Sequence, residues 1–159
     1  MGFPYSNRSV LLIFQSFSMI DWNPAPTPFQ SCGVLSTTFS TPIVDSTLYR
    51  QLVGSLLYLT YRRPDLSFVV GLVSLFSHDA HESHWQAAKH ILRYIWGTTC
   101  YDIHYTSGDP HIVGYTDSYW ASDIDDQKST SVFIFFLGSG PITWSCKKQH
   151  AHILSSIEA

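Results

Sequence analysis

Histidine is the first residue type in this sequence whose spacing suggests chemistry. His78, His81 and His84 follow one another at three-residue intervals. Side chains three residues apart lie on one face of a helix, and imidazole nitrogen is a common zinc ligand, so this spacing resembles a metal site. No cysteine lies near these histidines in the sequence, and the solvated start of a helix would account for the same pattern. We therefore expect a helix start here and no zinc ion.

Lysine and arginine side chains are the second group of residues that suggests a function, because they are able to contact a nucleic-acid backbone. Lys147 and Lys148 follow Trp144 at the end of a strand-like run, which fits either phosphate contact or a solvated strand end. Five more basic residues fall in the middle third of the chain: Arg50, Arg62, Arg63, Lys89 and Arg93. The formal net charge is −3, whereas a free-standing nucleic-acid binder is usually strongly basic. The sequence therefore predicts weak, salt-sensitive binding at most.

The composition is that of a folded chain with little surface charge. The 159 residues suffice for one domain or two small pieces, and 45% of them are hydrophobic and 15% aromatic, so that a core can form. Charged residues are only 13% of the chain, which predicts low solubility. Three widely spaced cysteines, Cys32, Cys100 and Cys146, indicate a reducing compartment rather than a disulfide framework. No apolar run reaches the roughly 18 residues that a membrane helix requires.

Helical periodicity fills the middle of the chain, after an N-terminal segment of different character. Residues 1–46 comprise a short amphipathic stretch, helical over 10–17, and a Pro/Ser/Thr-rich linker or extended arm. Residues 47–99 contain three predicted helices, over 47–60, 66–77 and 82–96. The buried stripe of the first helix should consist of Leu48, Leu52, Leu56 and Leu59. Pro64 should end that helix, Asp65 should cap the second, and Gly97 should cap the third at its C-terminus.

After Gly97 the periodicity becomes that of strands. Four strands are predicted, over 101–106, 111–117, 131–137 and 142–147. Short turn sequences separate them, so residues 100–159 should form an antiparallel meander. The expected fold class is therefore α+β, with the helices first and the sheet second.

Motifs of one family run through both halves. The first half contains Tyr49-Arg50-Gln51-Leu52-Val53-Gly54-Ser55-Leu56-Leu57-Tyr58-Leu59-Thr60, Arg63-Pro64-Asp65, Ala87-Ala88-Lys89 and Ile91-Leu92-Arg93-Tyr94. The second half contains Gly114-Tyr115-Thr116-Asp117-Ser118, Trp120-Ala121, Lys128-Ser129-Thr130-Ser131, Phe136-Leu137-Gly138-Ser139-Gly140 and Lys147-Lys148-Gln149. In these motifs the chain resembles the Pol polyprotein of copia-type retrotransposons.

The resemblance implies that the two halves of the chain belong to two different domains of the polyprotein. Residues 47–99 resemble the C-terminal helical part of a reverse transcriptase, its thumb or connection segment. Residues 100–159 resemble an incomplete RNase H domain, cut off before its active site is finished. RNase H hydrolyses RNA–DNA hybrids with two Mg²⁺ ions held by about four carboxylates. The family pattern places the first carboxylate at Asp117, as a vestigial catalytic and magnesium-binding residue. Glu158 is a weaker second candidate, because it lies two residues before the position that aligns with the catalytic glutamate.

One matched carboxylate cannot hold two divalent ions against water. We therefore expect no tight Mg²⁺ binding and no hydrolysis by this chain alone, with weak contact to an RNA–DNA hybrid or template-primer as the remaining activity. In the RNase H fold the first strand is central, so the strand over 111–117 should keep one edge unpaired. Phe133, Phe135 or Trp144 should be poorly buried, depending on register. An unpaired, β-prone edge predicts self-association.

Three hypotheses stay open at this stage. The chain is a noncatalytic remnant of a transposon enzyme, or a working RNase H completed by another chain or a longer product, or a secreted interaction protein that reuses the remnant. We expect an intracellular chain, cytoplasmic or nuclear, without membrane association and without secretion.

Overall fold

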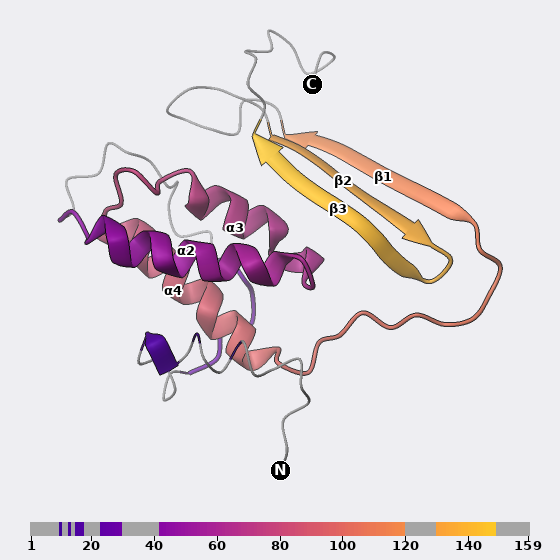
Figure 1. Cartoon of the computed structure of the whole chain (residues 1–159), viewed down its shortest axis with the longest axis horizontal. Helices are drawn as coiled ribbons and strands as arrows, with labels where there is room; N and C mark the ends of the chain where they lie inside the picture. Colours follow the sequence, from indigo (N-terminus) through magenta and orange to yellow (C-terminus); the bar gives the residue numbers. More distant parts are fainter. Residues whose placement is uncertain are drawn as a thin grey trace, which may run out of the picture.

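A helical body and a three-stranded sheet follow one another along the chain (Figure 1). The computed structural model describes residues 10, 13, 15–17, 23–29, 42–119 and 130–148, without the side chains of residues 118 and 119. The helical body contains α2 (Ser46–Thr60), the 3-10 helix η2 (Pro64–Leu66), α3 (Ser67–Ser74) and α4 (Glu82–Gly97). The sheet contains β1 (Ile112–Tyr119), β2 (Thr130–Leu137) and β3 (Gly140–Lys148). The expected α+β class is confirmed.

Helix α2 begins at a side-chain cap and buries one stripe of residues. Oδ1 of Asp45 accepts hydrogen bonds from the backbone N–H groups of Thr47 and Leu48, at 2.8 and 3.4 Å, which satisfies two donors of the first turn. The buried stripe consists of Tyr49, Leu52, Val53, Leu56 and Leu59. The expected place of Leu48 in this stripe is wrong, because its side chain is exposed and the buried position belongs to Tyr49. The Tyr49 hydroxyl donates to the carbonyl of Val73 at 2.7 Å, which joins α2 to α3.

The turn between α2 and α3 differs from the expected one in the role of Asp65. Pro64 begins η2 after α2 has ended, as its fixed φ and missing N–H require. No side-chain cap is present at the start of α3. The prediction that Asp65 caps this helix is wrong, since its carboxylate pairs with Arg63 instead. Helix α3 ends at Ser74, three residues before the expected end, and Ser77 belongs to the turn that follows.

The C-terminal end of α4 is shaped by a packed segment rather than by a glycine cap. Gly97 is the last helical residue and Thr98 is the C-cap, so the expected cap at Gly97 is wrong. A Cβ atom at Gly97 would lie 2.8 Å from Cβ of Pro24, which explains the absence of a side chain there. Residues 23–29, named here the arm, lie against this helix, with Ala25 buried and its N–H donating to the Arg93 carbonyl at 3.2 Å.

The rest of the N-terminal segment is partly described. Of the expected helix over 10–17, the described residues are helical as far as residue 16, and Val10 is buried in the core. Residues 42–44 form a short antiparallel contact with 80–82, in which Val44 N–H donates to the Ala80 carbonyl at 2.9 Å. The division expected after residue 46 stays a prediction: α2 begins at Ser46, and the segment before it is hydrogen-bonded to the helical body.

The sheet is an antiparallel meander in the order β1-β2-β3, as expected. The two-residue turn Gly138-Ser139 joins β2 to β3, and Gly138 adopts φ 57°, a conformation that favours glycine. The expected strand over 101–106 is wrong, because these residues form an extended connection without strand pairing. This connection is fastened to the turn, where the Tyr105 hydroxyl donates to the Pro141 carbonyl at 2.7 Å.

Strand register separates the sheet into two faces of different burial. Trp144 and Cys146, opposite Ile134 and Val132, lie on the face that meets the helices. Phe133 and Phe135 lie on the opposite face, which we call the outer face, and each is 37% exposed. β1 is an edge strand, and its second edge pairs with no strand in the part of the chain that the structure describes. The expected poor burial therefore holds for Phe133 and Phe135, whereas Trp144 is half-buried against α2.

Candidate nucleic-acid interface

Asp117, the expected catalytic and magnesium-binding residue, lies near the end of β1. Its side chain is exposed, and it stands opposite Val132 in the β1–β2 register. Glu158, the other carboxylate candidate, lies outside the described residues, as do Asp123, Asp125 and Asp126. Within the described ranges, no group of three or more His, Cys, Asp or Glu side chains is placed to hold a metal ion. Both catalytic assignments stay predictions, and a Mg²⁺ site would require further ligands beside Asp117.

Two of the three histidines, His81 and His84, lie at a helix start, whereas His78 lies in the bend before it; the helix start is as expected, but its solvation is wrong for His84, which is buried. His81 is the N-cap of α4, and Nδ1 of His84 accepts from the backbone N–H of His81 at 3.0 Å. The His84 ring is fully buried and stacks on Phe76, with ring centroids 3.9 Å apart and an interplanar angle of 12°. Hydrogen bonding and stacking therefore account for the spacing that resembles a zinc site.

Arg63 lies in an internal network rather than on an open surface. Its guanidinium pairs with the Asp65 carboxylate at 2.8 Å and donates to the carbonyl and hydroxyl oxygens of Thr98, at 3.1 and 2.8 Å. The Tyr94 hydroxyl donates to the same carboxylate at 3.0 Å. Burial favours the neutral form of Asp65, but the hydrogen bond and charge of Arg63 outweigh it and hold the pKa of Asp65 below its usual value. These bonds hold the end of α2 against the end of α4. Arg63 could contact a phosphate only by giving up its bonds to Asp65 and Thr98.

Arg50 and Arg62 lie at the two ends of one exposed stripe of α2. Arg50, Gly54, Leu57 and Tyr58 follow helical spacing, and Tyr61 continues the stripe just beyond the helix. Arg50 donates to the carbonyl of Ser46 one turn earlier, at 3.0 Å, which orients it along the helix. Lys147 of β3 faces this stripe across a hollow of about 570 Å³ that Gly54, Tyr58 and Trp144 also line. Arg50, Arg62 and Lys147 therefore border one surface, which we call the α2–β3 surface.

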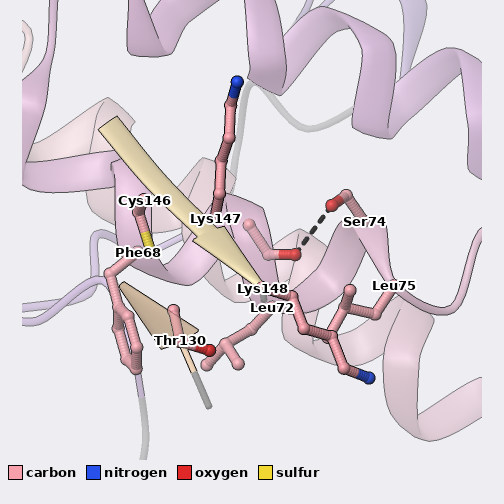
Figure 2. Close-up of a pocket in the computed structure, with 9 residues that line it drawn as sticks. Phe68, Leu72, Ser74, Leu75, Thr130, Cys146, Lys147 and Lys148 are labelled. Carbon is pink, nitrogen blue, oxygen red and sulfur yellow. Dashed lines mark hydrogen bonds between the residues drawn. The ribbon is translucent and has the colours of Figure 1, made fainter. Parts of the chain in front are cut away.

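Lys147 and Lys148 leave β3 in opposite directions, as strand alternation requires (Figure 2). Both line a smaller hollow of about 220 Å³ between α3 and β3, together with Phe68, Leu75 and Cys146. Cys146 packs close to the backbone of α3 at Gly71, and burial raises the pKa of its thiol. A thiol with a raised pKa is a poor nucleophile, so Cys146 serves packing between α3 and β3. Only Lys147 of the two lysines also borders the α2–β3 surface.

Lys89 and Arg93 lie on a different surface, on the face of α4 that carries the arm. Nε of Arg93 donates to the Asn23 carbonyl at 2.7 Å, and Nε2 of His90 lies 2.9 Å from the Thr27 carbonyl oxygen. Nζ of Lys89 lies 5.0 Å from the centre of the Trp85 ring, at cation–π distance. The seven predicted contact residues are thus divided between the α2–β3 surface, the hollow between α3 and β3, the face of α4 that carries the arm, and one internal network.

Aromatic residues next to the basic ones are the part of the interface that the sequence hypothesis missed. Tyr61 follows α2 directly and is 80% exposed. Tyr101 and Tyr105, in the connection before the sheet, border a hollow of about 410 Å³ together with Arg62 and Trp144. The only clue in the sequence is the pair of tyrosines in residues 101–106, a segment whose alternation predicts a strand.

Three relatives are similar to the chain over most of its length. It is 42% identical over 153 residues, 96% of the chain, to the retrovirus-related Pol polyprotein from transposon RE1 of Arabidopsis thaliana. Identity to the Pol polyprotein from transposon RE2 of the same plant is 39% over 153 residues, again 96% of the chain. Identity to the secreted RxLR effector protein 161 of Plasmopara viticola is 42% over 112 residues, 69% of the chain and 79% of that protein.

The matched regions differ greatly as shares of these relatives. The chain spans 10% of the length of each of the two polyproteins. No family model matches the chain, and no solved structure matches it. Across the described helices, none is both long and apolar enough to cross a membrane.

Proposed function

Because this chain belongs to the retrovirus-related Pol polyproteins of copia-type transposons, we propose that it forms the junction between the reverse-transcriptase helices and the RNase H sheet of such a polyprotein. The chain by itself is not a nuclease, and it contacts an RNA–DNA hybrid weakly, from an intracellular location. The α2–β3 surface supplies the contact, with Lys147 and Arg62 lining its hollows and Arg50 exposed on the same helix.

One observation carries the proposal: the sheet is attached to the helical body at the end of α2. Nε1 of Trp144 on β3 donates to the carbonyl of Thr60 at 2.7 Å, across 84 positions of sequence. A hydrogen bond from a half-buried indole fixes the direction of the strand relative to the helix. Arg62 and Lys147 are thereby held on either side of the contact, where a nucleic-acid backbone passing from one half to the other would meet both.

Binding of a blunt RNA–DNA hybrid tests this proposal. Fluorescence anisotropy at several salt concentrations should show weak binding that is the same with and without Mg²⁺ and that falls steeply with salt. The double variant Arg62→Gln/Lys147→Gln should reduce the slope of log K against log salt by about 2, because each lost phosphate contact removes about 1. Lys89→Gln, on the surface that carries the arm, is the matched control and should leave the slope unchanged. Submicromolar binding at physiological salt that the double variant does not weaken would place the contact elsewhere.

A second candidate function rests on the similarity to the effector protein, which covers 79% of that protein's length. In this alternative the same fold acts as a secreted interaction protein. The printed sequence contains no Arg-x-Leu-Arg segment, so it lacks the pattern after which that relative is named. Mass spectrometry of the mature chain separates the two candidates: uncleaved residues 1–46 fit the transposon junction, and a cleavage within residues 1–46 would favour secretion.

A further inference from the structure

Two hollows with aromatic residues in their walls lie on either side of Trp144. One hollow, of about 570 Å³, is lined by Tyr58, Tyr61, Trp144 and Lys147. The other, of about 410 Å³, is lined by Tyr61, Arg62, Tyr101, Tyr105 and Trp144. Because Tyr61 and Trp144 border both, we name the combined feature the junction groove. Each of the two hollows has a volume within the range of binding pockets for organic molecules, about 300–1,000 Å³.

Hydrogen bonds hold most of the groove wall in place before any ligand arrives. Trp144 is fixed by its bond to the Thr60 carbonyl, and Tyr105 by its bond to the Pro141 carbonyl. Gly140 leaves room for the Tyr105 ring, which would collide with any Cβ atom at that position. Tyr101 lies against the clamped guanidinium of Arg63, whose carbon is 5.4 Å from the ring centre. A wall held in this way loses little side-chain freedom on binding, which favours affinity.

The cations around the groove favour an anionic ligand, and its exposed tyrosines favour a ligand with flat rings. Lys147 stands at one end, Arg62 at the other, and Asp102 is the single acidic residue among the lining side chains of the two hollows. Tyr58 and Tyr61 are largely exposed, so their ring faces are open to a partner. Exposed aromatic rings between cations are the arrangement on which successive bases of a single strand stack, since every base has a flat face and every linkage a negative charge.

We propose that the junction groove binds unpaired single-stranded nucleic acid, with bases stacked on Tyr61 and its neighbours and with phosphates beside Arg62 and Lys147. The inference rests on the proposed function and adds the form of nucleic acid that this site takes. In a duplex the flat faces of the bases are covered by their neighbours, so a blunt hybrid engages the cations alone. A single strand engages the rings as well.

Parallel titrations of two probes test the groove: fluorescein-labelled oligothymidylate and a blunt RNA–DNA hybrid of equal length, with the full chain in both. We expect tighter binding of the single strand. Tyr61→Ala should weaken single-strand binding about fivefold or more, because stacking contributes about 1–3 kcal/mol per base, whereas Tyr61→Phe, which keeps the ring, should retain it. Neither change should alter hybrid binding.

The control is Tyr115→Thr, which removes an exposed tyrosine of similar kind from β1, outside the groove. It should leave single-strand binding unchanged, and circular dichroism of all variants should match the parent chain. Equal binding of both probes, with Tyr61→Ala without effect, would overturn the groove and leave the proposed hybrid contact standing. Absence of binding to either probe would overturn both.

Discussion

The helical body and the sheet differ in how completely they bury their apolar residues. Leu52, Leu56, Leu66 and Leu92 of the helical body are fully buried, in one cluster that joins all its helices. In the sheet, Phe133, Phe135 and Leu137 of the outer face keep more than a third of their surface in water. The helical body therefore completes its own core, whereas the sheet packs one face on the helices and leaves Phe133, Phe135 and Leu137 of the other face partly exposed.

This difference follows from how each half makes contacts. The helices meet pairwise through stripes of leucine and valine, and the arm adds Ala25 to the same core. The sheet contacts the helices chiefly through β3, at Trp144 and Cys146, and β1 lies farthest from the helices (Figure 1). Thr130 of β2 also lines the hollow against α3. Exposed apolar surface of this kind is typical of faces on which another segment or chain packs.

The largest expected effect is the loss of stability when a buried leucine of the helical body is truncated, compared with truncation of a phenylalanine on the outer face of the sheet. Leu92→Ala removes a side chain that is 0% exposed and should lower the free energy of unfolding by about 2–5 kcal/mol, since it leaves a cavity. Phe133→Ala, at a site that already meets water, should cost clearly less. Urea unfolding followed by far-ultraviolet circular dichroism measures both. An equal or larger loss at Phe133 would show that the outer face is buried in solution.

A charged residue on the outer face tests whether the chain self-associates through that face. We expect the chain to self-associate, and Phe133→Lys should weaken the association about tenfold or more, because a lysine that loses water in the contact costs well above the ~1.4 kcal/mol of a tenfold change. Leu48→Lys is the matched control, since Leu48 of α2 has the same 37% exposure as Phe133. Sedimentation velocity over a range of concentrations gives the measurement. A monomer at all concentrations would contradict the expectation.

A pair of glycines tests how the arm is held on α4. Gly97→Ala places a Cβ atom 2.8 Å from Cβ of Pro24 and should displace the arm, with a loss of roughly 1 kcal/mol of stability and faster proteolysis within residues 23–29. Gly54→Ala meets no atom within 4 Å and should instead stabilise α2 by up to about 1 kcal/mol, as alanine favours helix. Denaturant unfolding and limited proteolysis of both variants decide the matter. Equal behaviour of the two would mean that the arm is not seated there.

The smallest effect concerns the pH dependence of the clamp at Arg63. The pKa of Asp65 is lower in the folded chain than in the unfolded chain, so the folded state binds its proton less readily. The resulting stabilisation is present above the unfolded pKa and is lost as the pH falls through the folded pKa. Asp65→Asn should therefore flatten the acid side of the stability curve, measured by urea unfolding at several pH values. An acid side as steep as in the parent chain would assign the loss to other groups.

The sequence predicted most elements because their periodicity is strong, and it failed where a distant segment decides the role of a residue. The meander order and the ends of α2 followed from turn sequences and from Pro64. Asp65 has the position of a helix cap, but its carboxylate pairs with Arg63 and accepts a hydrogen bond from Tyr94, which lies 29 positions away. Gly97 looked like a terminal cap, and the packing of Pro24 against it is invisible at the level of local sequence.

The candidate interface was predictable in its residue types but not in its grouping. Charge and position alone put Arg63, Lys89 and Arg93 together with Arg50 and Arg62. The fold assigns Arg63 to a clamp and turns Arg93 toward Asn23, because the bonds involved join residues 35 and 70 positions apart. The tyrosines over 101–106 were read as a strand, since alternation alone cannot show whether a neighbouring strand exists to pair with them.

Cleavage of an RNA–DNA hybrid tests the central claim, a noncatalytic junction, most directly. The labelled RNA strand of a hybrid is incubated with the full chain and with Asp117→Asn, in Mg²⁺ or Mn²⁺, and the products are separated by denaturing electrophoresis. We predict intact RNA with both proteins, because two divalent ions require about four converging carboxylates and the described residues provide no such group beside Asp117. Metal-dependent cleavage by the parent chain that disappears in Asp117→Asn would contradict the account.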